Sequence, residues 1–444
     1  MKIYNTYTSS YEEFIPLKKG QVSMYVCGPT VYNYIHIGNA RPVIFFDTVR
    51  RYFEYLGYHV DFASNFTDVD DKIIQKAIDE HKTEKEVSEY YINAFLEDVA
   101  RLGSKTDYLK PKVTEYMNQI IAYIEALVDK GFAYQKDGDV YFRVSKVEEY
   151  GHLSNRKLDD LISGARVEVN ELKESPVDFT LWKKTETGIA WDASFSKGRP
   201  GWHTECCTMI DDIFHGKIDI HGGGSDLIFP HHENEIAQSI AQHDHSLAQI
   251  WMHNGRLNLD GEKMSKSLGN LIWVKDLPVN PKSFRLFVLA THYRSPLNYS
   301  SDNLEAYDKE YLKMVSTVSQ LHRKLDLQNI EMVSEVQDET LLGFLNRFME
   351  AMDYDFNTPN AITELQGLIK WINVALRSKV DWSVFSSAGY LADLFMDILG
   401  IKESYTPLSS EDKELFRKWD EARANKDFEA ADVYRQALQN KGLV

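Results

Sequence analysis

Alternating and helical hydrophobic patterns follow one another along the first part of the chain. Residues 21–28 (QVSMYVCG) are an apolar run that predicts a strand, and residues 58–66 alternate like a second strand. Between them, residues 38–57 repeat apolar positions at the helical period. This order predicts a βαβ unit and therefore a parallel sheet covered by helices. Further helices are expected from Asp68, over 83–102 and over 112–131.

The pattern changes between residues 135 and 195, where short runs such as Val140–Val144 are separated by polar turns. We interpret this stretch as part of an insertion at about 105–195. The alternation of strand and helix then resumes, with a helix near 202–213, a strand at 217–220 that ends in three glycines, and a helix from about 231.

From residue 300 onward the segments have helical periodicity, and the end of the chain predicts a hairpin of two helices, Ser409–Ala424 and Phe428–Gln439. The expected architecture is α/β: a doubly wound parallel-sheet (Rossmann-like) domain with an insertion, followed by an all-α helical bundle. The expected domain boundaries are 1–300, 301–404 and 405–444.

Charge and cysteine content narrow the class of protein. The chain has 50 Lys and Arg against 67 Asp and Glu, a net charge of −17, which excludes a uniformly basic nucleic-acid coat but not local phosphate contacts. The odd set Cys27, Cys206 and Cys207 argues against a disulfide framework. Because we find neither a long apolar stretch nor an apolar leader in the first residues, we expect a cytoplasmic protein with no membrane partner.

Two short motifs suggest nucleotide chemistry. His36-Ile37-Gly38-Asn39 stands where the first strand gives way to a helix, whose N–H groups attract phosphate; a turn with a surface histidine is the alternative. The second motif is Lys263-Met264-Ser265-Lys266-Ser267, bracketed by glycines. Its lysines suit charge growing on a leaving pyrophosphate, whereas the alternative is a solvated basic loop.

A metal constellation is also possible. His231 and Glu235 are four residues apart at the start of a helix and share one face. Together with thiolates from Cys27 and Cys206 they form a Cys-Cys-His-Glu set that fits one zinc ion; a helix cap or a core contact is the alternative. Cys207 points about 100° away from its neighbour on a helix, so we interpret it as core packing.

The run His221-Gly222-Gly223-Gly224-Ser225-Asp226 follows a predicted strand. Its glycines permit close approach of a ligand to the backbone, and Asp226 can accept hydrogen bonds from a ribose. The alternative is a flexible turn.

Taken together, these segments resemble a class I aminoacyl-tRNA synthetase. The flanking sequences resemble the cysteinyl-tRNA synthetase family in particular, essentially from end to end. They are MYVCGPTVY from Met24, NFTDVDDK from Asn65, GRPGWH from Gly198 and FPHHENE from Phe229.

The resemblance implies one zinc ion per chain, held by Cys27, Cys206, His231 and Glu235. It also implies that substrate cysteine binds this zinc through its own sulfur, so that serine is rejected without editing. Thr67 and Trp202 would face the substrate, although Trp202 could also be a core residue.

For ATP, which would bind with Mg²⁺, the resemblance implies three catalytic residues: His36, Lys263 and Lys266. At the fourth position of the first motif the family usually has histidine, and Asn39 puts a mechanism with two imidazoles in doubt. The implied ATP-binding residues are Pro29, Gly38, Asn39, Gly222, Gly224, Asp226 and Lys266.

At the C-terminal end, Arg423, Phe428 and Asp432 fall on positions that resemble the family's anticodon readers. Phe428 could stack on a base while the two charged residues bond base edges. An amphipathic hairpin with solvated charges is the alternative. The residues Met352–Pro359 are expected within the bundle.

We therefore expect an ATP-dependent cysteine–tRNA ligase that acts as a monomer on L-cysteine, ATP and tRNA(Cys). One rival hypothesis is a ligase that joins cysteine to a small amine, as in mycothiol synthesis, but this family resembles only the first 300 residues. Another is a catalytically silent zinc and RNA-binding paralogue.

Overall fold

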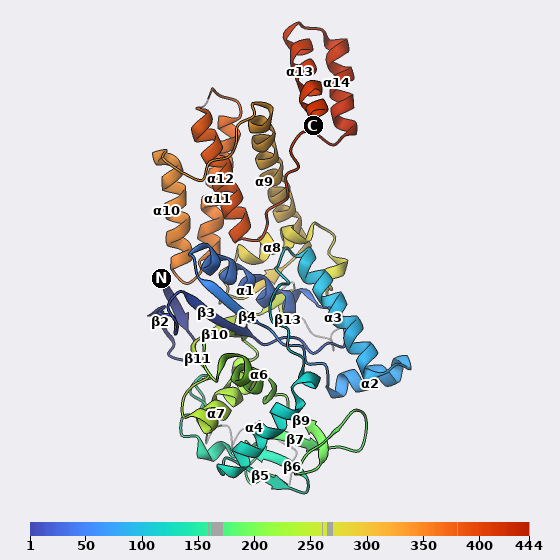
Figure 1. Cartoon of the computed structure of the whole chain (residues 1–444), viewed down its shortest axis with the longest axis vertical. Helices are drawn as coiled ribbons and strands as arrows, with labels where there is room; N and C mark the ends of the chain where they lie inside the picture. The colour runs from blue at the N-terminus through green and yellow to red at the C-terminus, as the bar shows by residue number, and fades with distance from the viewer. Residues whose placement is uncertain (159, 161–171, 260, 264–269, 380, 444) are drawn as a thin grey trace. The chain divides into compact units, whose positions relative to one another are not determined.

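A four-stranded parallel sheet forms the centre of the first compact unit (Figure 1). The computed structural model describes the chain except for residues 159, 161–171, 260, 264–269, 380 and 444. In the sheet the strand order is β11-β10-β3-β4, which confirms the expected parallel α/β fold. The strands are β3 (Gln21–Val26), β4 (His59–Ala63), β10 (Ile218–Gly224) and β11 (Ala248–Asn254).

Helix α1 (Ile37–Tyr55) joins β3 to β4 and completes the expected βαβ unit. It packs on the sheet through buried aromatic residues, and Phe46 meets β10 at Gly222. A Cβ atom on Gly222 would lie 2.1 Å from Cζ of Phe46, so only glycine allows the helix to approach this closely. The glycine is therefore required by packing, whatever else it does.

The helix that we expected from Asp68 begins at Asp71 instead. Asp70 is its N-cap, because its carboxylate accepts a hydrogen bond from the backbone N–H of Lys72. The carboxylate of Asp68 accepts two bonds from Thr114 instead. The helices of this unit that follow α1 are α2 (Asp71–Glu80), α3 (Glu84–Arg101), α4 (Met117–Asp129), α6 (Glu205–Phe214), α7 (Glu233–His243) and α8 (Pro281–Leu289).

Most of an antiparallel sheet falls within residues 105–195, where we expected an insertion. Its strand order is β5-β6-β7-β9-β8, and it lies beside α4 in Figure 1. Its buried residues Phe142 and Trp182 share one hydrophobic core with α4, α6 and α7. That core also contains Cys206 and Cys207, so the insertion supports the helix that carries them. Its strands are β5 (Ala133–Lys136), β6 (Asp139–Phe142), β7 (Phe179–Lys184), β8 (Trp191–Asp192) and β9 (Lys197–Pro200).

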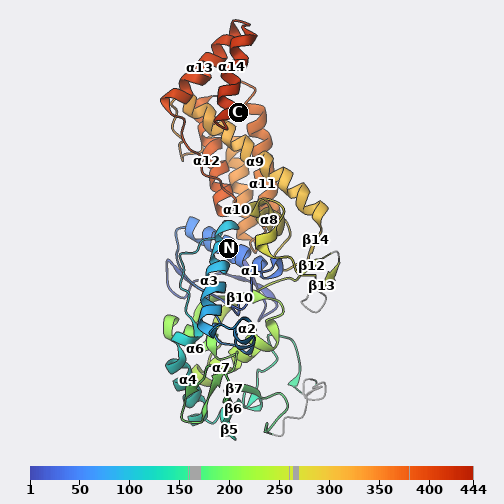
Figure 2. The same cartoon turned by 90° about the vertical axis from the view of Figure 1, so that its right-hand side faces the viewer.

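Two smaller sheets complete the unit. A three-stranded sheet of order β13-β12-β14 follows β11 and is seen best in Figure 2. Its strands are β12 (Leu257–Leu259), β13 (Glu262–Lys263) and β14 (Leu297–Tyr299). A two-stranded antiparallel sheet consists of β1 (Lys2–Asn5) and β2 (Ser10–Glu13), and short helical turns lie at Val113–Glu115, Val144–Lys146, Ile228–His232 and Val274–Asp276.

The C-terminal part is helical, as expected. The second compact unit covers residues 309–349, 360–397 and 401–444. In its bundle the rings of Phe348 and Phe395 stack with centroids 4.0 Å apart. The helices are α9 (Ser301–Leu327), α10 (Glu339–Asp353), α11 (Thr358–Ala375), α12 (Trp382–Ile398), α13 (Ser410–Ala424) and α14 (Phe428–Asn440).

The segment 350–359 belongs to the first unit, although we expected Met352–Pro359 in the bundle. The reason is Asp355, whose buried carboxylate accepts hydrogen bonds from the Tyr293 hydroxyl at 2.7 Å and from Arg294 Nε at 3.0 Å. Helical periodicity alone does not reveal such a contact. None of the helices in the described part of the chain combines the length and apolar character that crossing a membrane requires.

Candidate active site

The four residues predicted to hold zinc meet in one place. Cys27 follows β3, Cys206 lies in the first turn of α6, His231 lies in the turn before α7, and Glu235 lies in α7. Their ligand atoms lie within 4.8 Å of one another. The two Sγ atoms are 3.4 Å apart, and His231 Nε2 is 2.8 Å from Glu235 Oε1. Residues separated by up to 208 positions therefore form one pocket of donor atoms.

A cation that binds in this cluster competes with protons on its ligand atoms. Contact with the Cys27 thiol, opposed by burial, lowers the pKa of Cys206 to about 7, which brings the thiolate within reach at neutral pH. Burial alone would lower the pKa of His231, but the neighbouring carboxylate of Glu235 raises it to about 10. A metal that binds here must displace these protons, so its affinity rises with pH.

The chemistry of the donor set fits zinc. Two sulfurs, one imidazole nitrogen and one carboxylate oxygen are ligand types that Zn²⁺ accepts. Three of the four residues are buried, and Cys27 is partly buried. A hard ion such as Mg²⁺ prefers oxygen ligands alone. The cluster therefore fits zinc by its composition as well as by its geometry.

A second, overlapping group also meets the geometry of a metal site: Cys27 and Glu235 with His221 and His232. The sequence analysis did not predict that His221 and His232 lie at the metal site. His221 Nε2 is 2.5 Å from Glu235 Oε2, and its Nδ1 is 2.9 Å from the carbonyl of Tyr25. His221 thus contacts the oxygen of Glu235 that does not face His231, which is the arrangement of a residue that orients a ligand.

His232 joins the Cys27 thiol to a further histidine. Its Nε2 lies 3.3 Å from Sγ of Cys27, and its Nδ1 lies 2.8 Å from Nε2 of His253. The doublet His231-His232 was a visible signal for a second buried histidine. By contrast, nothing in the sequence linked either residue to His221 or His253, because the contacts depend on how β10, β11 and α7 pack.

The two predicted substrate residues have different environments. Thr67 is buried, and its hydroxyl donates a 2.6 Å hydrogen bond to Glu205, the neighbour of Cys206. Trp202 is 44% exposed, so it is not a core residue. Its ring stacks on the imidazole of His231 with centroids 4.2 Å apart. An aromatic face therefore covers one side of the candidate metal site.

The first motif lies at the start of α1. His36 is the N-cap of the helix, and its Nδ1 accepts a hydrogen bond from the backbone N–H of Asn39 at 3.3 Å. In the neutral ring Nε2 then carries the proton, which lets it donate to an anion. Pro29, His36 and Asn39 line one pocket together with Trp273. Gly38 lies in the first turn of the same helix.

The other predicted nucleotide residues are placed only in part. Gly222 and Gly224 lie at the carboxyl end of β10, and Asp226 follows them. In a parallel sheet this edge is where ligands bind, and the first motif lies at the same edge. Lys263 lies in β13, whereas Lys266 lies outside the described residues.

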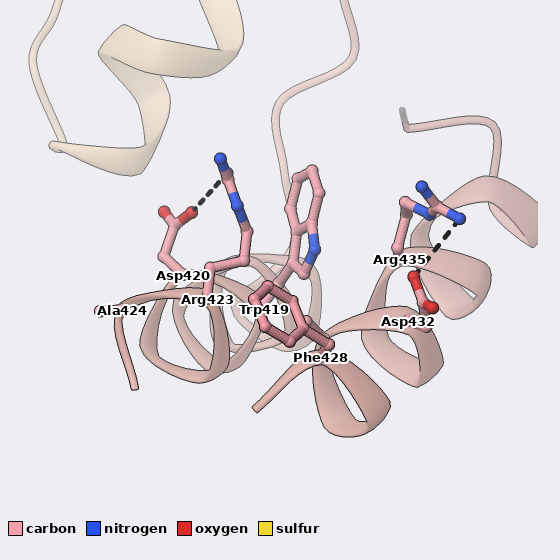
Figure 3. Close-up of a pocket in the computed structure, with 8 residues that line it drawn as sticks. Trp419, Asp420, Arg423, Ala424, Phe428, Asp432 and Arg435 are labelled. Atoms are coloured by element: carbon pink, nitrogen blue, oxygen red, sulfur yellow. Dashed lines mark ion pairs between the residues drawn. The ribbon is translucent and has the colours of Figure 1, made fainter. Parts of the chain in front are cut away.

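The three predicted anticodon residues line one pocket of the α13–α14 hairpin, with a volume of about 620 Å³ (Figure 3). Trp419 also lines it, and Phe428 is 71% exposed. Two ion pairs flank these rings: Arg423 with Asp420 and Arg435 with Asp432. The pocket thus offers aromatic faces together with both hydrogen-bond donors and acceptors.

Family models and solved structures match most of the chain. The family model for the tRNA synthetases class I (C) catalytic domain matches residues 13–309, and the model for the DALR domain matches residues 347–403. Among solved structures, methionyl-tRNA synthetase from Mycobacterium tuberculosis superposes with a TM-score of 0.62 at 14% identity, covering 86% of this chain and 90% of its own. The match of the family model over residues 13–309 identifies the chain as a class I aminoacyl-tRNA synthetase, and the fold agrees with that class.

Curated relatives identify the particular family. The chain is 46% identical to the cysteine–tRNA ligase of Acholeplasma laidlawii over 446 residues, which cover 100% of both chains. It is 47% identical to that of Streptococcus agalactiae, covering 100% of this chain and 97% of the relative. The chain belongs to the cysteine–tRNA ligase family. It is a ligase whose substrates are cysteine, ATP and tRNA.

Proposed function

We propose that Cys27, Cys206, His231 and Glu235 hold one zinc ion that selects cysteine by its sulfur. The observation that carries this proposal is the convergence of two thiols, an imidazole and a carboxylate within 4.8 Å. When bound, zinc supplies a soft Lewis-acid centre that a thiolate joins and a hydroxyl joins poorly. A site built on this difference rejects serine at the binding step.

His221 would keep Glu235 in its ligating orientation through the 2.5 Å contact to Oε2. Trp202, stacked on His231, would cover the bound amino acid and exclude water. Thr67 would lie beside the bound cysteine. Its hydroxyl donates a hydrogen bond to Glu205, the neighbour of Cys206.

The ATP site is proposed at the start of α1, around His36 and the N–H groups near Gly38. The carboxylate of cysteine attacks the α-phosphate of Mg²⁺-ATP; a new C(O)O–P bond forms, and the bond to pyrophosphate breaks. His36 donates from Nε2 to the phosphate, while Lys263 and Lys266 offset the charge on pyrophosphate. Pro29, Asn39, Gly222, Gly224 and Asp226 complete this proposed site.

In the second step the 2′-hydroxyl of the terminal adenosine of tRNA attacks the carbonyl of cysteinyl-adenylate and releases AMP. We propose that residues 405–444 read the anticodon, with Arg423, Phe428 and Asp432 contacting bases, and that residues 301–404 form the intervening bundle. The exposure of Phe428 in one pocket with Arg423 and Asp432 supports this role, because unpaired bases stack on accessible aromatic rings.

We further propose that the protein works as a monomer in the cytoplasm, where tRNA(Cys) is used. The rival ligase that joins cysteine to a small amine receives less support, because the relatives named cysteine–tRNA ligase match the helical part as well. Charging of a tRNA(Cys) transcript separates the two activities.

The experiment that tests the proposal is ATP–pyrophosphate exchange with cysteine and with serine, on protein of measured zinc content. We expect about one zinc per chain and exchange with cysteine at least about 10⁴-fold better than with serine. Removal of zinc by a chelator should abolish cysteine-dependent exchange, and added zinc should restore it. Full activity of metal-free protein would refute the proposed role of zinc.

A further inference from the structure

One buried arginine in α1 has an unusual set of partners. Arg41 is 1% exposed, and its two Nη atoms donate four hydrogen bonds, all to backbone carbonyls. The acceptors and donor–acceptor distances are Gly255 at 2.6 Å, Arg256 at 3.1 Å, His292 at 3.1 Å and Ser295 at 2.7 Å.

The burial of the positive charge of Arg41 is not explained by an ion pair. Within the described residues the Nη atoms of Arg41 bond backbone carbonyls and no carboxylate, and its Nε has no hydrogen-bond partner. Burial lowers its pKa to about 10, so the guanidinium is still charged at neutral pH. A guanidinium offers four Nη–H groups in one plane, and here each can meet one carbonyl. This geometry indicates that Arg41 holds segments of the backbone together and does not form an ion pair.

The four carbonyls that Arg41 binds lie in two loops that lead into neighbouring strands. Gly255 and Arg256 come directly before β12, and β12 pairs with β13, which carries Lys263. His292 and Ser295 lie in the loop that leads from α8 to β14, the other neighbour of β12. The four acceptors are therefore the base of the sheet β13-β12-β14.

Arg41 itself lies in the helix that begins at the first motif. Arg41 lies five residues after His36, the N-cap of α1. A single side chain thus links the helix that begins at His36 to the sheet that ends at Lys263, and both motifs belong to the proposed ATP site. Gly255 allows this close packing, because a Cβ atom there would lie 2.4 Å from the carbonyl oxygen of Ser295.

We propose that Arg41 is a positioning residue for ATP activation: it fixes the base of the sheet β13-β12-β14 relative to the start of α1, and so sets the position of strand β13, which carries Lys263, relative to His36. This inference rests on the proposed ATP site. Arg41 does not itself touch the reacting atoms; it acts on ATP through the backbone that it holds.

The test compares Arg41→Lys with Arg285→Lys in ATP–pyrophosphate exchange by the full-length, zinc-loaded protein. Arg285 is a matched control, because it is also fully buried and bonds Leu399, Ser104 and Asp47, away from both motifs. We expect Arg41→Lys to raise KM for ATP or lower kcat by about tenfold or more, with KM for cysteine and zinc content unchanged. Arg285→Lys should lower the melting temperature without changing KM for ATP.

Arg41→Ala should show the same defect and regain activity when millimolar guanidinium is added, because the vacated space retains its four carbonyls. An unchanged KM and kcat in Arg41→Lys, or equal losses for ATP and cysteine in both lysine variants, would overturn the inference. His36→Ala separates this failure from failure of the proposed ATP site. If His36→Ala activates cysteine normally, the site itself is misplaced.

Discussion

Cys206 and Cys207 are adjacent and both buried, yet only Cys206 belongs to the candidate metal cluster. Cys206 faces Cys27 at 3.4 Å, whereas the Cys207 thiol contacts the carbonyls of His203 and Glu235 within the core. The helical rotation of about 100° per residue accounts for the difference. Side-chain identity alone does not separate the pair, but the helical period does.

This pair gives the first prediction. Cys206→Ser should reduce zinc affinity by at least about 100-fold and raise KM for cysteine in parallel, because a hydroxyl replaces a thiolate ligand. The fold should persist, since the core around α6 remains. Zinc content by atomic emission and exchange kinetics measure both effects. Cys207→Ser is the control and should retain zinc; if both variants lose zinc equally, the ligand assignment is wrong.

Other site residues show where sequence reasoning ends. His231 and Glu235 could be paired because a spacing of four places two residues on one helical face. His221 could not be linked to Glu235 in the same way, since the contact crosses from β10 to α7. For Trp202 we expected a role facing the substrate, with a core residue as the alternative. The alternative is excluded, because this side chain is 44% exposed and stacks on His231.

At the scale of elements, regular local patterns predicted α1 and the hairpin within a few residues. Ser409 caps α13 with a capping box, a signal that the sequence carries openly. The strand predicted at 217–220 continues to Gly224 instead, because its glycines pair in register with Met252, His253 and Asn254 of β11. Glycine normally indicates a turn, and only the neighbouring strand reveals that the ladder continues.

The hairpin gives the second prediction. Phe428→Ala should weaken tRNA charging by about 1–3 kcal/mol in kcat/KM for tRNA, the usual contribution of stacking on one base. ATP–pyrophosphate exchange without tRNA should be unchanged. Val433 lies on the same helix and is 67% exposed but does not line the pocket, so Val433→Ala is the control. Equal effects of both substitutions on charging would contradict anticodon reading by this pocket.

At the scale of the whole molecule, one buried ion pair ties distant parts of the first unit together. Arg285 on α8 donates to Asp47 on α1 at 2.6 Å and to the carbonyl of Leu399 at 2.5 Å. Burial alone would raise the pKa of Asp47, but the nearby cations Arg285 and Arg51 hold it below its ordinary value of 3.8. Such a lowered pKa means that the charged carboxylate stabilises the folded unit.

The third prediction concerns stability. Asp47→Asn should lower the free energy of unfolding by about 3–5 kcal/mol, because it leaves the buried Arg285 without its counter-charge. Asp107→Asn is the control, since that carboxylate is 75% exposed in its pair with Arg50, and its loss should change the free energy by less than about 1 kcal/mol. Thermal or urea unfolding measures both.

The same carboxylate predicts a pH dependence. Because its pKa is lower in the folded state, the stabilisation by Asp47 is fully present above about pH 4 and is lost as the pH falls through the lowered pKa. Between pH 5 and pH 3 the wild-type protein should therefore lose more stability than Asp47→Asn. Parallel acid-unfolding curves for the two proteins would contradict this origin of the pKa shift.

The presence of Cys27 and Cys206 among the proposed zinc ligands has a consequence for accuracy over time. Every new copy of the protein is translated with cysteine that older copies attached to tRNA. A copy in which serine replaced either residue would lose a soft ligand, and with it the means of telling the two amino acids apart. Serine attached to tRNA in error would then enter new copies of the protein and cause further errors. A strict preference for sulfur therefore protects the synthesis of the enzyme itself.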